Sequence, residues 1–148
     1  MKIQGKQAQR QCIDATPQSM KKEVARQELI FQKKLDNVDD SKTKTQVDKY
    51  GNKHTLYSDK NGKVLFTRTE VNGYGGYTYA YRDNDNAIVR FGDIDKDGNM
   101  DNMSYSNEDS KNKPYTSFQA FDVNDDGTFD KGMPCTGKNA GKHFNIKN

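Results

Sequence analysis

Regularly spaced turn residues are the feature that most constrains how this chain of 148 residues can fold. After Asp39, Gly, Asn and Asp recur about every ten residues and separate short runs rich in β-branched and aromatic residues. Six of these runs have the length and composition of strands: 54–58, 63–70, 77–82, 87–91, 103–106 and 115–121. Because short turns join strands that run in opposite directions, the pattern predicts an antiparallel β meander of six or more strands.

Two local signals support this meander. Asn-Gly pairs at 61–62 and 72–73 are typical of two-residue hairpins. Three tyrosines alternate with smaller residues across 77–82, as expected for a half-buried strand. This Tyr-rich strand is also a candidate stacking surface for a partner, but packing within a small sheet is the favoured use.

The segment before the meander has the pattern of one helix. Thr16 and Pro17 combine an N-cap residue with proline at the first helical position. Apolar residues then recur along one face at helical spacing: Met20, Val24, Phe31, Leu35 and Val38, with Ile30 nearby. We expect a flexible arm over 1–15, an amphipathic helix over 16–40 and a β-rich domain over 41–148. The expected fold class is therefore α+β, with the helix packed on the sheet or paired with a partner protein.

Charge is unevenly distributed along the chain. The net charge is +3, yet residues 83–130 hold 12 acidic and 4 basic side chains. An acidic block attracts cations and does not lie along a nucleic-acid backbone, so no nucleic-acid partner is expected for it. A solvated loop surface has the same composition, so the spacing of the carboxylates must decide between the two.

Two segments of the acidic block share one pattern. Residues 93–101 read D-I-D-K-D-G-N-M-D, and residues 122–130 read D-V-N-D-D-G-T-F-D. Ca²⁺ takes about six to eight oxygen ligands, and alternate positions on a tightly wound loop direct oxygens at one centre. The pattern predicts one Ca²⁺ site per loop, with the side chains of Asp93, Asp95 and Asp97, and of Asp122, Asn124 and Asp126, as ligands. The backbone carbonyl groups of Asn99 and Thr128 are the expected next ligands.

The match to an EF-hand ends after the ninth position. The twelfth position, where an EF-hand has a bidentate Glu, holds Ser104 in the first loop and Met133 in the second. Strand-like residues, not helices, flank both loops. Helix-loop-helix EF-hands are therefore not expected.

Both loops resemble the D-x-D-x-D-G-x-x-D calcium loops of FG-GAP repeats in integrin-type propellers and of thrombospondin type 3 repeats. A Phe-Gly pair stands directly before Asp93, as in the name FG-GAP. The resemblance implies that Asp101 and Asp130, at the ninth position, are further ligands. It covers only 91–105 and 121–131, and the chain is too short for a propeller of at least four blades, so the fold of those families is not expected.

Two further loops fit the pattern less well. The loop that begins at Asp59 reads D-K-N-G and is better explained as a hairpin turn. The loop that begins at Asp83 reads D-N-D-N and lacks the glycine. Whether either of them binds an ion is open at this point.

Other motifs near the C-terminus are weaker. Residues 132–138 read G-M-P-C-T-G-K, like the start of a P-loop, but Asn139 replaces the Ser or Thr that would bind Mg²⁺. Cys135 and His143 are a candidate thiol and base. Cys12 and Cys135 are compatible with one disulfide or with two free thiols.

The sequence thus predicts a calcium-stabilised structural or interaction module without catalysis. The alternative is a small secreted enzyme or effector with a thiol site near Cys135 and His143. No apolar run reaches the length of a membrane span, and the N-terminus lacks the apolar stretch of a secretory signal. Loops without the bidentate Glu are expected to bind calcium with Kd on the order of 10⁻⁴ to 10⁻³ M, which favours an extracellular or surface location.

Overall fold

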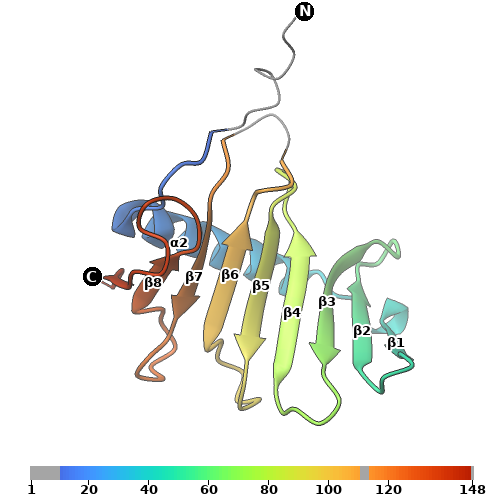
Figure 1. The fold of residues 1–148 in the computed structure, drawn as a ribbon. Coiled ribbons are helices and arrows are strands. Elements are labelled where there is room, and N and C mark those ends of the chain that lie inside the picture. The colour runs from blue at the N-terminus through green and yellow to red at the C-terminus, as the bar shows by residue number, and fades with distance from the viewer. Residues whose placement is uncertain (1–10, 111–113, 148) are drawn as a thin grey trace, which may run out of the picture.

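The computed structural model describes residues 11–110 and 114–147 and has an α+β architecture. Helix α2 (Pro17–Asp36) and a short 3-10 helix η1 (Asp40–Lys42) precede nine strands. The strands are β1 (Lys44–Val47), β2 (Lys53–Ser58), β3 (Val64–Glu70), β4 (Tyr77–Arg82), β5 (Ile88–Asp93), β6 (Asn102–Ser106), β7 (Ser117–Phe121), β8 (Lys131–Pro134) and β9 (Phe144–Asn145). They form one antiparallel sheet whose spatial order is the order of the chain, so the predicted meander is confirmed (Figure 1).

Three strands were not recognised from their sequences. Strand β1 is exposed at every position, β8 contains a Gly and a Pro, and β9 has two residues. Each is defined by pairing with a neighbour and not by a pattern of its own. Neither expected two-residue hairpin forms. The connection from β2 to β3 runs from residue 59 to residue 63, and the connection from β3 to β4 runs from residue 71 to residue 76.

Local sequence determines where α2 begins. The Thr16 hydroxyl accepts a hydrogen bond from Ser19 N at 3.0 Å, and Ser19 Oγ accepts one from Thr16 N at 2.8 Å. This reciprocal cap satisfies two amides that have no partner within the helix, and Pro17 occupies the first helical position. The helix ends at Asp36, before the expected residue 40, and Asp39 caps η1 instead.

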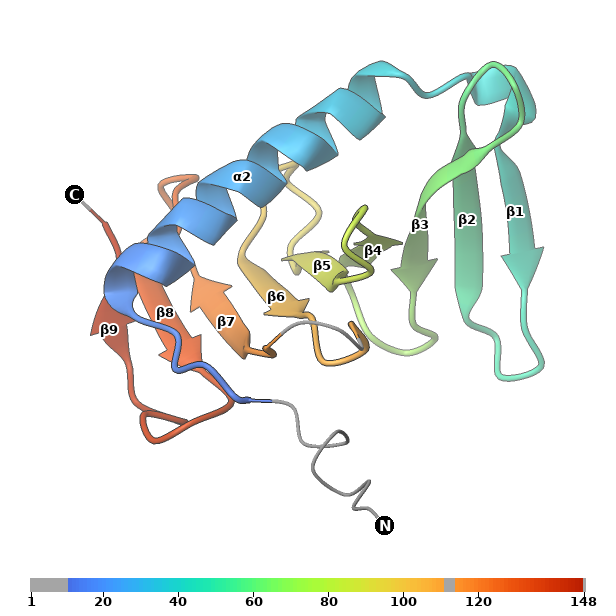
Figure 2. The same ribbon diagram turned by 90° about the horizontal axis from the view of Figure 1, so that it is seen from above.

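Helix α2 crosses one face of the sheet, and its apolar stripe is buried within this chain (Figure 2). Phe31 lies at the centre, stacked on Phe91 with ring centroids 4.9 Å apart and edge-on to Phe66 at 5.3 Å. The expectation that Leu35 belongs to the stripe was wrong, because its side chain is 40% exposed.

A buried polar side chain interrupts the stripe. Gln27 is fully buried, and its Oε1 accepts a hydrogen bond from the Tyr81 hydroxyl at 2.8 Å. Its Nε2 donates to Asp83 Oδ2 at 3.0 Å. A buried amide needs hydrogen-bond partners for both its oxygen and its nitrogen. The bonds of Gln27 to Tyr81 and Asp83 therefore fix the position of the helix on the sheet.

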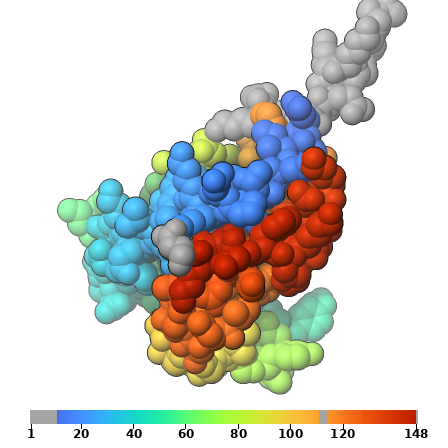
Figure 3. Space-filling model, turned by 90° about the vertical axis from the view of Figure 1, so that its left-hand side faces the viewer, coloured from blue at the N-terminus to red at the C-terminus, as the bar shows by residue number. Residues whose placement is uncertain are grey.

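The N-terminal end of α2 lies beside the C-terminal segment, as Figure 3 shows on the molecular surface. Gly132 of β8 permits this close approach, since a Cβ atom there would lie 2.9 Å from Met20 Cε and 3.1 Å from Ile146 Cγ2. The opposite face of the sheet carries no helix in the part of the chain that the structure describes (Figure 2).

Part of the expected N-terminal arm belongs to the fold. Ile13 N donates to Tyr115 O, Tyr115 N donates to Gln11 O, both at 2.9 Å, and Ala15 is buried. The expected arm is therefore too long at its C-terminal end, and residues 1–10 lie outside the described residues. Cys12 and Cys135 are both free thiols. Among the described residues, no helix is long and apolar enough to cross a membrane.

Candidate metal centre

The two Asp-rich loops lie at the same end of the sheet. The first joins β5 to β6 and the second joins β7 to β8. In an up-and-down meander, connections that are separated by one hairpin return to the same end. Asp122 N donates to Asp101 O at 2.9 Å, which ties the start of the second loop to the end of the first.

The first aspartate of each loop organises its backbone in the same way. Its carboxylate accepts a hydrogen bond from the amide of the glycine five positions ahead, at 3.0 Å from Gly98 N to Asp93 Oδ2 and at 2.8 Å from Gly127 N to Asp122 Oδ2. The amide of the fifth residue also donates to this carboxylate, at 3.2 Å in both loops. Both loops are therefore wound around their first carboxylate.

The ninth position closes each loop. Asp101 Oδ2 accepts a hydrogen bond from Ile94 N at 2.6 Å, and Asp130 Oδ2 accepts one from Val123 N at 2.8 Å. The resemblance implied that Asp101 and Asp130 are ligands. Their side chains turn towards the loop, and their role as ligands stays a prediction.

The backbone angles of the two loops also agree. The fourth residue has a positive φ in both, 58° at Lys96 and 57° at Asp125, and the sixth is a glycine with φ of 91° or 87°. A positive φ is uncommon for residues other than glycine, so the fourth residue is strained in each loop. The matching angles show that the two loops share this conformation. The sequence pattern predicted the glycine but not the conformation of the fourth residue.

Carboxylate oxygens converge in three groups, within each of which they lie within 4.8 Å of one another. The groups are Asp93, Asp95 and Asp101 in the first loop, Asp122, Asp126 and Asp130 in the second, and Asp95, Asp97 and Asp125 between the loops. Asp97 was expected to face the centre of its own loop, but it groups with Asp125 of the other loop.

The amide of Asn124 lies at the centre of the second loop. When the amide nitrogen faces the carboxylates, this nitrogen lies 3.0 to 3.1 Å from one oxygen of each of three side chains, Asp122, Asp126 and Asp130. The opposite rotation would present its oxygen to the same point. Asn124 can therefore hold the carboxylates together or serve as a ligand.

The seventh position contributes backbone hydrogen bonds. Asn99 N donates to Asp97 Oδ1 at 2.8 Å, and Thr128 N donates to Asp126 Oδ1 at 2.9 Å. The Thr128 hydroxyl donates to the same Asp126 oxygen at 2.7 Å. These bonds orient the fifth-position carboxylates.

One carboxylate in each loop is removed from water. Asp93 is 2% exposed and Asp130 is 6% exposed. Backbone amides satisfy both oxygens of Asp93. Asp130 Oδ1, by contrast, is buried without a hydrogen-bond donor, and Lys147 Nζ lies 3.6 Å away. A buried charged oxygen without a donor is costly, which makes it a site that favours a cation.

The electrostatic environment differs between the two loops. Desolvation and the neighbouring Asp97 and Asp101 carboxylates raise the pKa of Asp95 above its usual value. The Asp97 carboxylate also raises the pKa of Asp125 across the gap between the loops. The pKa of Asp126 is instead lowered, chiefly because Lys147 donates a hydrogen bond to it. Among the described residues, the second loop thus has a partner cation that the first lacks.

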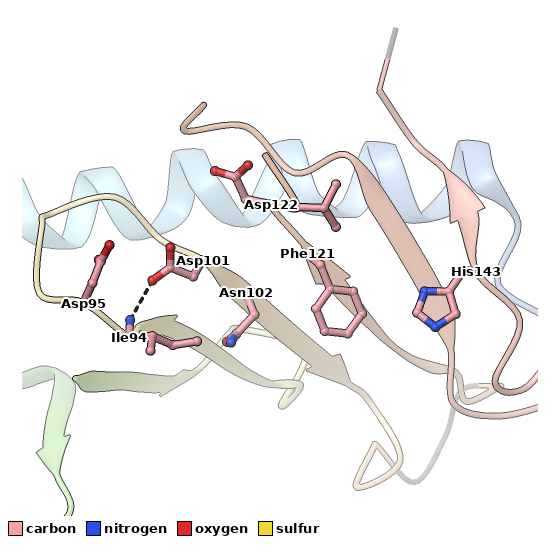
Figure 4. A pocket seen from close by; sticks show the side chains of 8 residues that line it. Ile94, Asp95, Asp101, Asn102, Phe121, Asp122 and His143 are labelled. Carbon is pink, nitrogen blue, oxygen red and sulfur yellow. Dashed lines mark hydrogen bonds between the residues drawn. The ribbon is translucent and has the colours of Figure 1, made fainter. Parts of the chain in front are cut away.

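An open pocket lies between the loops, and Figure 4 shows Asp95 and Asp101 on one side of it with Phe121 and His143 on the other. His143 stacks on Phe121 with ring centroids 6.0 Å apart.

The alternative hypothesis, a thiol site near Cys135 and His143, receives no support from the described contacts. The Cys135 thiol contacts Met133 O at 3.9 Å and makes no described contact with His143. Burial raises the pKa of Cys135, whereas an activated thiolate needs a lowered pKa.

The other Asp-led loops are turns. Asp59 Oδ1 accepts hydrogen bonds from the amides of Asn61 and Lys63. The Asp83 side chain is 3% exposed and is bonded to Arg26 and Gln27 of α2. Its carboxylate thus attaches the helix to the sheet.

Comparison of the chain with known protein families, with curated proteins and with solved structures finds no match. A functional proposal therefore rests on the geometry and chemistry of the two loops.

Proposed function

We propose that the loops at Asp93 and Asp122 each bind one Ca²⁺ ion, and that the protein is a calcium-stabilised structural or interaction module. The observation that carries the proposal is the repeated convergence of carboxylates in two loops with one backbone geometry. Turn chemistry alone accounts for the first aspartate of each loop. It does not account for the additional carboxylates that face the same point.

The identity of the ligands favours calcium over other metals. The candidate ligands are carboxylate, amide and carbonyl oxygens, which suit a hard cation. Zinc and copper prefer nitrogen or sulfur ligands, whereas the three groups consist of aspartate carboxylates. Mg²⁺ demands near-ideal octahedral geometry and retains several waters, whereas loops with many oxygens suit Ca²⁺.

Bound ions would stabilise the sheet where it is most acidic. Each loop joins two adjacent strands, so an ion held by the loop opposes their separation. Because the unfolded chain does not hold the ligands together, binding energy adds to folding energy. The weak affinity that we expect, on the order of 10⁻⁴ to 10⁻³ M, favours a calcium-rich extracellular setting.

The test is calcium stoichiometry in single-loop variants. Isothermal titration with CaCl₂ should give two ions for the wild type and one each for Asp93→Ala and Asp122→Ala. Asp59→Ala is the matched control, because Asp59 also opens a hairpin but has no converging carboxylates. Absence of calcium binding by the wild type at millimolar concentration would refute the proposal.

A further inference from the structure

The C-terminal segment places a lysine against the second loop. Lys147 Nζ forms an ion pair with Asp126 Oδ2 and lies 3.6 Å from Asp130 Oδ1. These oxygens belong to two of the three carboxylates that converge in that loop. The ammonium therefore occupies the surroundings in which an ion would be bound.

The backbone that carries this lysine is fixed next to the site. Ile146 is 4% exposed, and its amide donates to Asp130 O at 2.9 Å, which extends the pairing of β8 and β9. Lys147 N donates to Asn145 Oδ1 at 2.9 Å. The Lys147 side chain itself is 44% exposed, so it can turn into solvent without disturbing the buried segment.

Within the described residues, the first loop has no equivalent cation, since no Lys or Arg there forms an ion pair with Asp93, Asp95 or Asp101. Lys96, which belongs to this loop, points away from its centre: its Nζ lies 2.8 Å from Glu70 Oε1 and 4.7 Å from the centre of the Tyr77 ring. The two loops thus share one backbone geometry but differ in whether a lysine faces their carboxylates.

We propose that Lys147 is a tethered competitor for calcium at the second loop, so that the loop at Asp93 fills first and the loop at Asp122 fills only when Lys147 is displaced. This inference rests on the proposed function. Lys147 Nζ contacts Asp126 Oδ2 and Asp130 Oδ1, whereas the Asn124 amide at the centre of the loop faces the other oxygen of each carboxylate. A Ca²⁺ ion at that centre and the ammonium group would thus share two carboxylates and repel each other at short distance. Filling of the second loop therefore releases the Lys147 side chain into solvent, while Ile146 keeps the backbone of the segment in place.

The experiment is a CaCl₂ titration of the full chain followed by heteronuclear NMR. The amides of Gly98 and Gly127 report on the two loops separately, because each donates to the first carboxylate of its own loop. Lys147→Met removes the charge and keeps most of the side-chain length. Lys138→Met is the matched control: it removes the same charge from the connection between β8 and β9, which lies at the opposite end of the sheet from the loops.

In the wild type, the Gly98 signal should saturate at a lower calcium concentration than the Gly127 signal. Lys147→Met should lower the Kd of the second loop about tenfold, the scale of one close charge interaction near a protein surface. The Kd of the first loop should stay within about twofold, and Lys138→Met should change neither loop.

Four outcomes would overturn the inference. An unchanged Kd at Gly127 in Lys147→Met would show that the lysine does not compete. An equal decrease of the Kd at Gly127 in Lys138→Met would show that the effect comes from the net charge of the protein alone. If neither glycine responds to calcium in any variant, the proposed function fails as well, whereas normal binding at Gly98 with an insensitive Gly127 removes this inference alone.

Discussion

At five connections of the sheet, an aspartate accepts a hydrogen bond from the amide four residues ahead. These aspartates are Asp48, Asp59, Asp83, Asp93 and Asp122. The shared bond is ordinary turn chemistry, in which an Asp side chain substitutes for a backbone acceptor. Only the last two have further carboxylates that converge on the first, so the residues after the turn distinguish a candidate ion site from a structural turn.

Asp83 is expected to be structural. It accepts hydrogen bonds from Arg26 Nη2 and from Gln27 Nε2, each at 3.0 Å. Asp83→Ala should lower the free energy of unfolding by about 2 kcal/mol, because it removes charge-assisted hydrogen bonds to Arg26 and to the buried Gln27 amide. Gln27 Nε2 keeps a second acceptor, Glu23 Oε2, at 2.8 Å. Urea unfolding measures this loss. Asp59→Ala, which removes only bonds to turn amides, should cost about 1 kcal/mol. Equal losses in the two variants would contradict the assigned role.

Asp48 should contribute pH-dependent stability. The hydrogen bond with His54 lowers the pKa of Asp48 from 3.8 to about 2. A carboxyl whose pKa is lower in the folded state stabilises the fold above its unfolded pKa, and this contribution disappears as the pH falls through the folded pKa. The difference in unfolding free energy between wild type and Asp48→Asn should therefore shrink from about pH 4 to pH 2. A constant difference across that window would show that ionisation of Asp48 does not matter.

At the scale of elements, α2 acts as the single cover of the sheet within the described residues. Its ends follow from local sequence, through the cap at Thr16 and the change to η1 after Asp36. Most helical stability in proteins comes from packing of an apolar face, not from propensity. The aromatic cluster around Phe31 is where α2 gains that packing.

Phe31→Ala should destabilise the protein by about 3 to 5 kcal/mol, because the ring is 5% exposed and packs on Phe66 and Phe91. Leu29→Ala is the control on the same helix. Leu29 is 74% exposed, so its loss should stay within about 0.5 kcal/mol. Chemical denaturation compares the two. A small effect at Phe31 would mean that the helix contributes little to the stability of the sheet.

For the whole molecule, the topology of the meander is what brings the two acidic loops together. Asp95, Asp97 and Asp125 approach one another from different hairpins. Without a bound cation these carboxylates repel, and each loop also holds a non-glycine residue at positive φ. We therefore expect this end of the sheet to be the part whose stability depends most on ions.

Calcium should raise the melting temperature, and a chelator should lower it. At roughly 100 times Kd, one occupied site adds about 2.7 kcal/mol of stability. For a domain of this size that corresponds to about 5 to 10 °C. Calorimetry with CaCl₂ and with chelator tests this, and MgCl₂ at equal ionic strength is the control. Identical transitions in all three would exclude stabilisation by calcium.

Local sequence determined the elements whose signals are short-range. The Thr16 cap and the apolar stripe predicted α2, and alternation with turn residues predicted most of the strands, because these patterns depend on neighbours within a few positions. The spacing of the aspartates likewise predicted two loops of one kind. Their first and ninth carboxylates turn inward as expected, since backbone amides inside the loop hold them.

Only the tertiary structure decided what depends on distant residues. It removed Leu35 from the core and buried Gln27, because the partner of Gln27 is Tyr81 on β4. It added β1, β8 and β9, whose order comes from pairing and not from their own patterns. It grouped Asp97 with Asp125 and brought Lys147 to Asp126. Such contacts join segments far apart in the chain, and local spacing carries no information about which segments the sheet will place side by side.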